Sequence, residues 1–418
     1  MNIVIVASLY APHGGGGAEL VAQNQAEGFA ARGHTVHVLT LGEPGSGTQH
    51  TTLNGVHVIR IGIRNLYLPF TSHPSAWTRV AWHTRDIYNA PAAQLACAQL
   101  AELRPDIVVC HNVYGWSAAI WRAIKSQGLP IVQVLHDQYL RCVRSNMFKD
   151  QRCVTPCASC RLVRLPHRGL SRLPDAVVGV SRYVIDSHIE DGFFQSVPVR
   201  THIHNASHLD TRSRPTPPLD VPDIVYGFIG TLTANKGIEP LLSAFHSVAR
   251  PHWRLRVAGT GPPGFVERLR ADHADSRIEF LGRQDPASFY LGLDATVVPS
   301  LWNDTFPSVV FESLIHGRPV IGARRGGIPE IVEDGLSGIL YEPDDTEGLE
   351  GALVRFAADI RGWRSRQAAI KALSAPRYCD REDWITRWES LCRQVIEDAP
   401  GTPTRSQVSG QPPDGKRL

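Results

Sequence analysis

The chain has 418 residues, which is enough for two domains of ordinary size. A hydrophobic content of 43% and a charged content of 20% are typical of a soluble globular protein, and a net charge of +3 is too small to indicate nucleic acid as a partner. The sequence shows no apolar run of membrane-spanning length and no signal-peptide pattern. Eight cysteines in a chain without a secretory signal favour a reducing compartment, so we expect a cytoplasmic protein.

The chain opens with a predicted strand at residues 3–7, a glycine-rich loop and a helix over about residues 18–32. This order creates an anion site, because the free N–H groups at a helix N-terminus point at the ligand. The loop reads P-H-G-G-G-G-A-E, and Gly15, Gly16 and Gly17 are its candidate contacts. The glycines alone are equally compatible with a flexible turn.

The rest of the first half alternates apolar strands with helical patterns, as at residues 92–103 and 116–126. This alternation predicts a mostly parallel sheet with helices on both faces. The aromatic-rich segment 65–88 favours core packing over the alternative of an acceptor groove. The further strands are expected at residues 34–40, 56–61, 106–110, 131–135, 176–180 and 200–204.

Two histidines directly follow predicted buried strands. His136 comes after the strand at 131–135, and His111 comes after the strand at 107–110. The carboxyl ends of parallel strands form the ligand-binding edge of an open α/β sheet, which makes both histidines candidate ligand contacts. A purely structural role is the alternative for each.

Residues 141–172 form a predicted insertion that is rich in cysteine and in basic residues. The spacing C-x10-C-x3-C-x2-C of Cys142, Cys153, Cys157 and Cys160 predicts a structural zinc site. Disulfides and cysteines buried merely as small apolar residues are the alternatives. The segment carries eight Lys or Arg and the single acid Asp150. This excess suits peripheral attachment to the inner face of an anionic membrane or contact with a pyrophosphate-linked acceptor, and a solvated basic loop is the alternative.

The proline-rich stretch 208–223 reads as an interdomain linker, after which the α/β pattern restarts. A strand ending at Gly230 leads through the turn T-L-T-A-N-K-G to a helix at 238–248. Lys236 therefore lies near a helix start, where its charge and the helix dipole both favour a diphosphate. Gly259 and Gly261 follow the next strand and predict a tight turn below the ligand.

The stretch 299–330 carries the strongest pattern in the chain. A strand runs into a loop with Asp304, and a short helix at 306–316 is ended by Gly317. Asp304 would reach a ligand over the helix start, and Glu312 would accept hydrogen bonds from a sugar diol. For an acidic pair without context, a helix cap and a solvated glutamate are the alternative.

We expect the remaining chain to form a strand at 337–341, helices at 346–358 and 363–373, and a terminal helix at 380–397 that packs back across the domains. The predicted organisation is an N-terminal domain (1–207), a linker (208–223), a C-terminal domain (224–375), the terminal helix segment (376–398) and a disordered tail (399–418).

The run D-T-F-P-S-V-V-F-E-S-L-I-H-G-R-P-V-I-G, followed by G-G-I-P-E-I-V, resembles the E-x7-E region of retaining glycosyltransferases of family 4. The glycine loop and the K-G turn resemble the same family, and the resemblance covers about residues 1–398. Two departures stand out: Asp304 replaces the first Glu, and Thr231 replaces an expected Arg. Arg324 and Arg325 are candidate substitutes for that missing cation.

The resemblance implies a GT-B fold, with two Rossmann-like domains facing each other across a cleft. It also implies that Glu312 binds the ribose diol, Lys236 the diphosphate, and Asp304 the sugar hydroxyls, with His136 close to the donor sugar. The catalytic candidates are His136, Asp304 and Glu312. The implied donor-binding set is Gly230, Lys236, Gly259, Gly261, Asp304, Phe306, Pro307, Ser308 and Glu312.

The implied activity is retaining transfer of a sugar from a UDP-, GDP- or ADP-sugar to a glycan or lipid-linked acceptor, in polysaccharide or glycoconjugate biosynthesis. No metal cofactor is expected for the transfer itself, and the glycine loop (Gly15, Gly16, Gly17) would line the cleft near the donor phosphate and the acceptor. The alternatives are a nucleotide-sugar epimerase of the same fold and a non-catalytic glycan- or nucleotide-binding protein.

Overall fold

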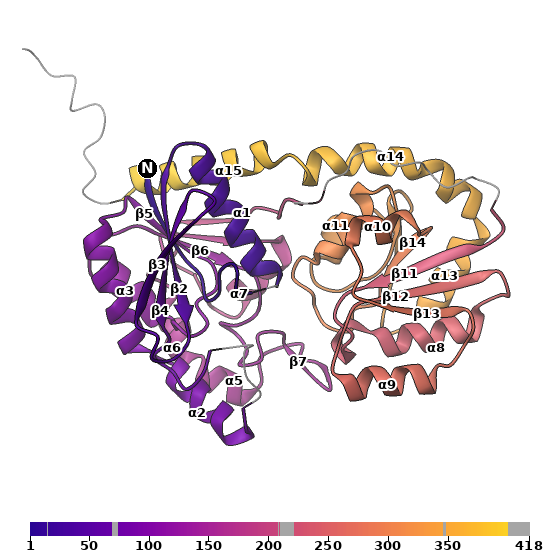
Figure 1. Cartoon of the computed structure of the whole chain (residues 1–418), viewed down its shortest axis with the longest axis horizontal. Helices are drawn as coiled ribbons and strands as arrows, with labels where there is room; N and C mark the ends of the chain where they lie inside the picture. Colours follow the sequence, from indigo (N-terminus) through magenta and orange to yellow (C-terminus); the bar gives the residue numbers. More distant parts are fainter. Residues whose placement is uncertain (15, 69–73, 208, 210–220, 346–347, 400–418) are drawn as a thin grey trace, which may run out of the picture.

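The computed structural model describes residues 1–14, 16–68, 74–207, 209, 221–345 and 348–399. Two parallel sheets dominate it, one in each half of the chain, and they lie side by side (Figure 1). Most of the predicted linker (208 and 210–220), Gly15 of the glycine loop and the predicted tail from residue 400 lie outside the described residues.

The first sheet has eight strands in the order β10-β9-β6-β5-β1-β2-β4-β3, and a separate two-stranded hairpin, β7-β8, lies in the cysteine-rich insertion. All neighbours in the sheet are parallel except β3 and β4. The sequence did not predict β3, because its polar residues T-Q-H-T-T-L form a mostly exposed edge strand without apolar alternation. The strands are β1 (Asn2–Val6), β2 (Thr35–Gly42), β3 (Thr48–Leu53), β4 (Val56–Gly62), β5 (Ile107–Cys110), β6 (Ile131–Leu135), β7 (Phe148–Lys149), β8 (Gln151–Arg152), β9 (Ala176–Gly179) and β10 (Val199–His202).

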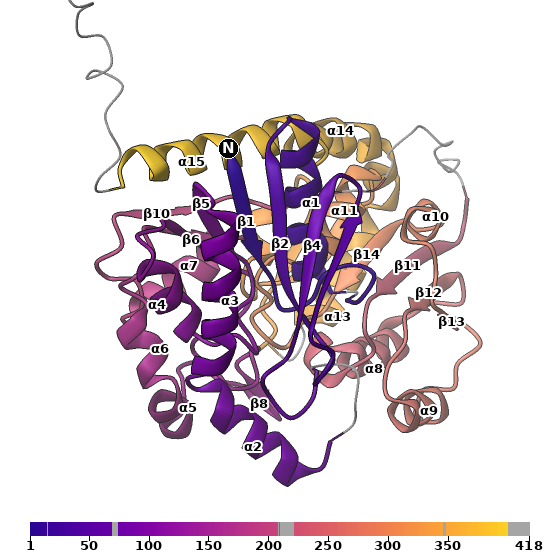
Figure 2. The same ribbon diagram turned by 60° about the vertical axis from the view of Figure 1, so that its left-hand side comes forward.

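Helices cover both faces of this sheet, as its continuous apolar strands require. The turned view of Figure 2 shows α3 and α4 on one side of the sheet and α1 on the other. These helices are α1 (Gly17–Ala31), α2 (Ala76–Asp86), α3 (Ala90–Leu103), α4 (Ala119–Lys125), α5 (Ala158–Val163), α6 (Leu165–Leu170) and α7 (Arg182–Glu190).

The second sheet is parallel throughout, with six strands in the order β13-β12-β11-β14-β15-β16. Its strands are β11 (Ile224–Ile229), β12 (Trp253–Ala258), β13 (Ile278–Gly282), β14 (Ala295–Val298), β15 (Val320–Ala323) and β16 (Gly338–Tyr341). The helical segments around it are the 3-10 turn η1 (Ala234–Lys236), α8 (Ile238–Val248), α9 (Pro263–Asp272), α10 (Pro286–Leu291), α11 (Ser308–Ile315), α12 (Ile328–Ile331) and α13 (Gly348–Ala358).

The chain ends in two long helices, α14 (Ile360–Tyr378) and α15 (Arg381–Glu397), which run along one side of both sheets (Figure 1). The predicted domain border at 375/376 lies inside α14. Pro376 falls in the last turn of this helix, which ends only at Tyr378. α15 packs on α1 of the first half: Arg32 forms ion pairs with Glu382 at 2.7 Å and Glu389 at 3.0 Å. A Cβ on Gly28 would lie only 3.0 Å from Ile385.

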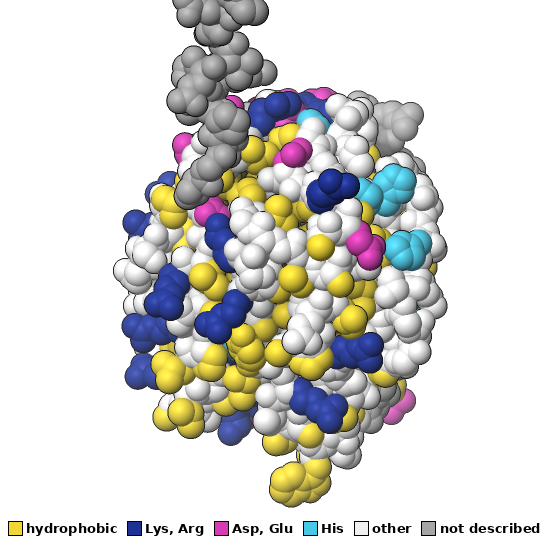
Figure 3. Space-filling model, turned by 90° about the vertical axis from the view of Figure 1, so that its left-hand side faces the viewer, with side chains coloured by type: hydrophobic (Ala, Val, Ile, Leu, Met, Phe, Trp, Pro, Cys, Tyr) yellow, Lys and Arg dark blue, Asp and Glu magenta, His cyan; other side chains and the backbone are white. Residues whose placement is uncertain are grey.

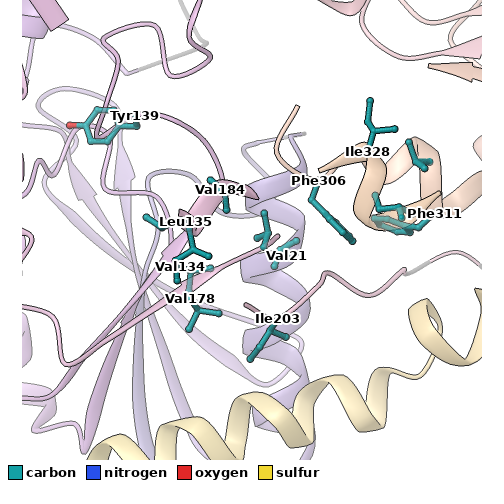
Figure 4. Packing of buried hydrophobic residues seen from close by; sticks show 14 of the residues in the cluster. Val21, Val134, Leu135, Tyr139, Val178, Val184, Ile203, Phe306, Phe311 and Ile328 are labelled. Atoms are coloured by element: carbon teal, nitrogen blue, oxygen red, sulfur yellow. The ribbon is translucent and has the colours of Figure 1, made fainter. Parts of the chain in front are cut away.

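One hydrophobic core extends through both halves of the chain. In Figure 4, Phe306 and Phe311 of the second half lie across from Val21 on α1 and Val184 on α7. The core therefore continues across the boundary between the two sheets. Among the described residues, no helix is both long enough and apolar enough to cross a membrane.

Candidate functional site

The candidate site is a cavity of about 580 Å³ between the two halves. Its walls come from the loop before α1 and the end of β6 on one side, and from the ends of β11 and β14 with α11 on the other. These are carboxyl ends of parallel strands, the edge at which open α/β sheets bind ligands. Of the sequence-predicted residues, it brings together Gly16, Gly17, His136, Gly230, Lys236, Asp304, Phe306, Pro307, Ser308 and Glu312.

The glycine loop places the N-terminus of α1 at this cavity. Gly16 is the N-cap residue with an extended backbone, and no side chain caps the helix. The free N–H groups of the first turn are therefore available to an anion. Glu19 also lines the cavity, and a Cβ on Gly16 would come within 2.4 Å of its carboxylate, so a larger residue here would require the flexible Glu19 side chain to move.

His136 is held at the cavity wall by a chain of hydrogen bonds. Its Nε2 lies 2.9 Å from Nδ1 of His111, and His111 Nε2 lies 2.7 Å from Oε1 of Gln25. Because an amide oxygen only accepts, His111 carries its proton on Nε2 and accepts at Nδ1, so His136 donates from Nε2. Burial lowers the pKa of His136 to about 4, which keeps its imidazole neutral near pH 7. His111 thus lies behind His136 and orients it, and it does not line the cavity.

Lys236 and Asp304 meet across the start of α11. The Nζ of Lys236 lies 2.5 Å from the Asp304 carboxylate and 5.0 Å from the centre of the Trp302 ring. Gly237 permits this geometry: its φ is +74°, and a Cβ there would lie 1.8 Å from the Pro299 carbonyl oxygen. The ammonium and the carboxylate are thus paired on the cavity wall.

Glu312 is the second acid of the cavity and is only 7% exposed. Tyr290 on α10 donates a hydrogen bond from its hydroxyl to Glu312 Oε2 at 3.0 Å. Burial raises the pKa of Glu312, and hydrogen bonds from Tyr290 and Ser308 partly offset that rise. The ring of Tyr290 is itself stacked on His316 at 5.4 Å, so the position of the carboxylate is fixed by packed neighbours.

Gly259 and Gly261, two predicted donor contacts, do not line the cavity, so their contact with the donor stays a prediction. Instead, a Cβ on Gly259 would come within 1.8 Å of the Gly230 carbonyl oxygen, and one on Gly261 within 2.2 Å of that of Leu232. These glycines let the loops after β11 and β12 pack closely, and so shape the site from behind.

The missing cation at Thr231 is not replaced by either candidate arginine. Arg324 is paired with Asp334 and Glu342, Arg325 is paired with Asp344, and neither side chain lines the cavity. Lining residues that the sequence reasoning missed are Asn24, Asn112, Asp137, Asn205 and Trp302. Asn112 and Asp137 each follow a strand-end histidine directly, a signal that could have identified them.

The four cysteines of the insertion gather loosely around a small apolar cluster. The Sγ atoms of Cys142 and Cys160 are 3.9 Å apart, Cys153 is half-buried beside them, and Cys157 is exposed. All eight cysteines of the chain are free thiols. Within the described ranges no group of three or more His, Cys, Asp or Glu is placed to hold a metal ion, so the zinc site stays a prediction.

Comparison with known families matches both halves of the chain. Residues 16–205 match the model of a glycosyl transferase 4-like domain, and residues 223–359 match that of glycosyl transferases group 1. An uncharacterised 42.6 kDa protein in a cps region of Klebsiella pneumoniae is 30% identical over 338 residues, covering 79% of this chain and 87% of the relative. The N-acetyl-alpha-D-glucosaminyl L-malate synthase of Bacillus anthracis is 23% identical, covering 95% of this chain and 98% of the relative.

Solved structures share the arrangement of both halves. A sucrose-phosphate synthase from Thermosynechococcus elongatus superposes with a TM-score of 0.73 at 19% identity, covering 94% of this chain and 99% of that one. HepE from Anabaena, in complex with UDP and glucose, has a TM-score of 0.68 at 17% identity, with the same coverage. This likeness confirms the expected GT-B fold, two Rossmann-like domains that face each other across a cleft.

Proposed function

The chain belongs to the group 1 glycosyltransferases of the family 4 type, and on that premise we propose that it transfers a sugar from a nucleotide-sugar donor to a glycan or lipid-linked acceptor, with retention of anomeric configuration. Two relatives support a role in polysaccharide or glycoconjugate biosynthesis: one lies in a cps region, and the other is an N-acetyl-alpha-D-glucosaminyl L-malate synthase. The HepE complexes with UDP and UDP-glucose support a nucleotide-sugar donor.

The Lys236–Asp304 pair carries the proposal. An ammonium at the start of a helical segment, on the wall of a cavity between the domains, is the group that a diphosphate requires. When the donor binds, the Lys236 ammonium exchanges its ion pair with Asp304 for one with the diphosphate. The Asp304 carboxylate, now free of Lys236, accepts hydrogen bonds from the hydroxyls of the donor sugar. The Glu312 carboxylate accepts hydrogen bonds from the two hydroxyls of the ribose.

The transfer breaks the bond between the anomeric carbon and the diphosphate oxygen, and the acceptor oxygen bonds to that carbon from the same face. The acceptor proton passes to a diphosphate oxygen. Negative charge therefore develops on the leaving group, where Lys236 and the N–H groups of the first turn of α1 stabilise it. His136 is neutral and donates from Nε2 to His111, so its Nδ1 can accept a hydrogen bond from a sugar hydroxyl without adding charge. This scheme needs no metal ion, because these groups supply the positive potential.

A thermal-shift screen with UDP, GDP, ADP and their sugars tests the donor site. A ligand at 100 times its dissociation constant stabilises the folded state by about 2.7 kcal/mol. Lys236→Ala and Glu312→Gln are expected to remove the shift, whereas Glu267→Gln, an exposed glutamate on α9, retains it. A panel without any shift, or shifts that survive in both site variants, would overturn the assignment.

Turnover then separates the candidate activities. Product formed with the anomeric configuration of the donor, read by NMR of the new linkage, supports retaining transfer, and inverted product contradicts it. Free nucleoside diphosphate together with an epimerised sugar, formed without acceptor, would instead identify an epimerase. Tight donor binding without turnover under any acceptor would identify a binding protein.

A further inference from the structure

A second cavity, of about 320 Å³, lies on the first domain between α5, α6 and the end of α7. None of its lining residues also lines the cavity between the two halves that we propose binds the donor. It is lined by four arginines and two acids: Arg141, Arg161, Arg164, Arg168, Glu190 and Asp191. One arginine and one acid neutralise each other, because Arg141 Nε lies 2.6 Å from the Asp191 carboxylate.

Arg164 is a buried cation that lacks a carboxylate partner. It is 2% exposed, and its guanidinium lies 4.2 Å from the centre of the Tyr139 ring. Within the part of the chain that the structure describes, its Nε and Nη2 find no hydrogen-bond acceptor. Asp86 interacts with it electrostatically, but that carboxylate accepts its hydrogen bonds from Tyr139 and Gly115. Buried N–H groups without an acceptor are costly, so an incoming anion would be stabilised here.

Arg161 and Arg168 extend this positive charge to the surface. Both are exposed, and neither forms an ion pair with a described acid. The segment from Ala158 to Arg172 holds four arginines and no acid. Of the two acids that line the cavity, Asp191 is paired with Arg141, and Glu190 forms no ion pair with a described residue. Guanidinium groups bind phosphate through pairs of parallel hydrogen bonds, so the chemistry of this cavity fits a phosphate group.

Exposed apolar side chains lie on α5 and α6, which border this cavity, and on the neighbouring helix α2. Leu162 is 73% and Leu165 61% exposed, on α5 and α6, and on α2 Trp77 is 84% and Val80 58% exposed. α2 lies beside α5 and α6 in both Figure 1 and Figure 2, and His83 of α2 interacts electrostatically with Arg164. Figure 3 shows this side of the molecule, where basic side chains alternate with apolar ones over the lower part.

We propose that this cavity binds the phosphate of an anionic membrane lipid, while the apolar side chains of α2, α5 and α6 enter the acyl region. A soluble phosphate would engage the arginines alone and would leave large apolar side chains in water. The lipid explains both features together. The sequence predicts membrane attachment by residues 141–172 as a whole. The proposal assigns the contact within that segment to α5 and α6, and it includes α2, which the sequence analysis did not connect with the membrane.

Vesicle co-sedimentation tests the charge requirement. The full chain is expected to bind vesicles of phosphatidylcholine with phosphatidylglycerol, to bind phosphatidylcholine alone weakly, and to lose binding as salt rises. Each cation near an anionic surface contributes about a fivefold factor in partitioning, so Arg161→Gln with Arg168→Gln is expected to weaken binding about 25-fold. Arg268→Gln, an exposed arginine on α9 of the other domain, is the matched control and leaves binding unchanged.

A second pair of variants tests the apolar contact. Leu162→Ser with Leu165→Ser is expected to weaken vesicle binding while leaving any effect of free glycerol phosphate on the melting temperature intact; Leu373→Ser, exposed on α14, is the control. Equal binding to neutral and anionic vesicles, or full binding by either double variant, overturns the proposal. The proposal is also overturned if the protein binds glycerol phosphate through Arg161 and Arg168 but does not bind vesicles. Binding is measured without donor, so the result is independent of the transfer reaction.

Discussion

Tyr290→Phe tests whether the Glu312 carboxylate depends on its buried hydroxyl partner. The substitution removes one oxygen and with it the 3.0 Å hydrogen bond to Oε2, while the ring remains to fill the same space. Both residues are buried. A hydrogen bond to a charged group contributes about 1.5–3 kcal/mol, so the variant should lose up to that much of its unfolding free energy at about pH 8, well above the ordinary pKa of a glutamate.

The same loss should move the pKa of Glu312 further upward, because the ionised carboxylate loses a hydrogen-bond donor. Burial already raises this pKa, so the folded state holds the proton more tightly than the unfolded state. The contribution of such a group to stability is full below the unfolded pKa and falls as the pH rises through the folded pKa. The difference between variant and parent should therefore shrink to about 0.5–1.5 kcal/mol near pH 4, where the carboxyl is protonated.

Tyr226→Phe is the matched control. Tyr226 is equally buried in the same domain, and its hydroxyl donates at 2.9 Å to a neutral acceptor, the carbonyl oxygen of Leu353. Its loss should cost about 0.5–1.5 kcal/mol at both pH values. Urea unfolding at the two pH values, compared through midpoint shifts at a common slope, measures both variants. If the cost of Tyr290→Phe is the same at both pH values, or no larger than that of Tyr226→Phe at the higher one, the reasoning fails.

Three further predictions concern the donor site, the insertion and the terminal helix. Asp304→Asn removes the partner of Lys236, so free nucleoside diphosphate should bind several-fold more tightly by calorimetry while turnover of the donor sugar falls; weaker diphosphate binding would contradict the exchange of partners. If the four insertion cysteines hold zinc, elemental analysis of chelator-free protein should find about one zinc per chain, and Cys157→Ser should lower the melting temperature before it affects turnover; four freely titrating thiols without metal would refute the site. Ile385→Ala empties the contact of α15 with α1 and should cost about 2–5 kcal/mol, seen as a lower urea midpoint; an unchanged midpoint would show that α15 does not stabilise the first domain.

The second domain could be predicted closely because its signals are local. α8 occupies residues 238–248 as predicted, between Gly237 and the end of the apolar pattern. Lys236 and Asp304 follow β11 and β14, which are hydrogen-bonded neighbours in the sheet. The loops after neighbouring parallel strands emerge at the same edge, so two residues 68 positions apart come within hydrogen-bond distance.

Other parts of the site depend on contacts that no local pattern records. Tyr290 lies on a six-residue helix whose sequence resembles any short buried helix, and only the packing of α10 on α11 makes its hydroxyl the partner of Glu312. The sequence also shows that a glycine follows a strand, but not what approaches it. At Gly259 the approaching group is the carbonyl oxygen of Gly230, which packs against the tight turn that the sequence predicts there.

The cleft itself is fixed by polar contacts between the two domains. Thr305 Oγ1 donates to the carbonyl oxygen of His136 at 2.6 Å, so the loop that carries Asp304 is tied to the residue after β6. On the same side, the Glu330 carboxylate accepts from the backbone N–H groups of Arg182 and Tyr183, at the N-terminus of α7. The loop that carries Asp304 and Thr305 therefore fixes the position of Asp304 relative to His136.

The contact made by Glu330 should respond to acid. Burial acts to raise the pKa of Glu330, but hydrogen bonds from His204 and the two N–H groups of α7 outweigh it and lower that pKa. A carboxyl with a lowered pKa contributes stability above its unfolded pKa, and this contribution is lost as the pH falls through the folded value. Acid therefore weakens the bridge between the domains while the apolar contact of α15 with α1 is unaffected.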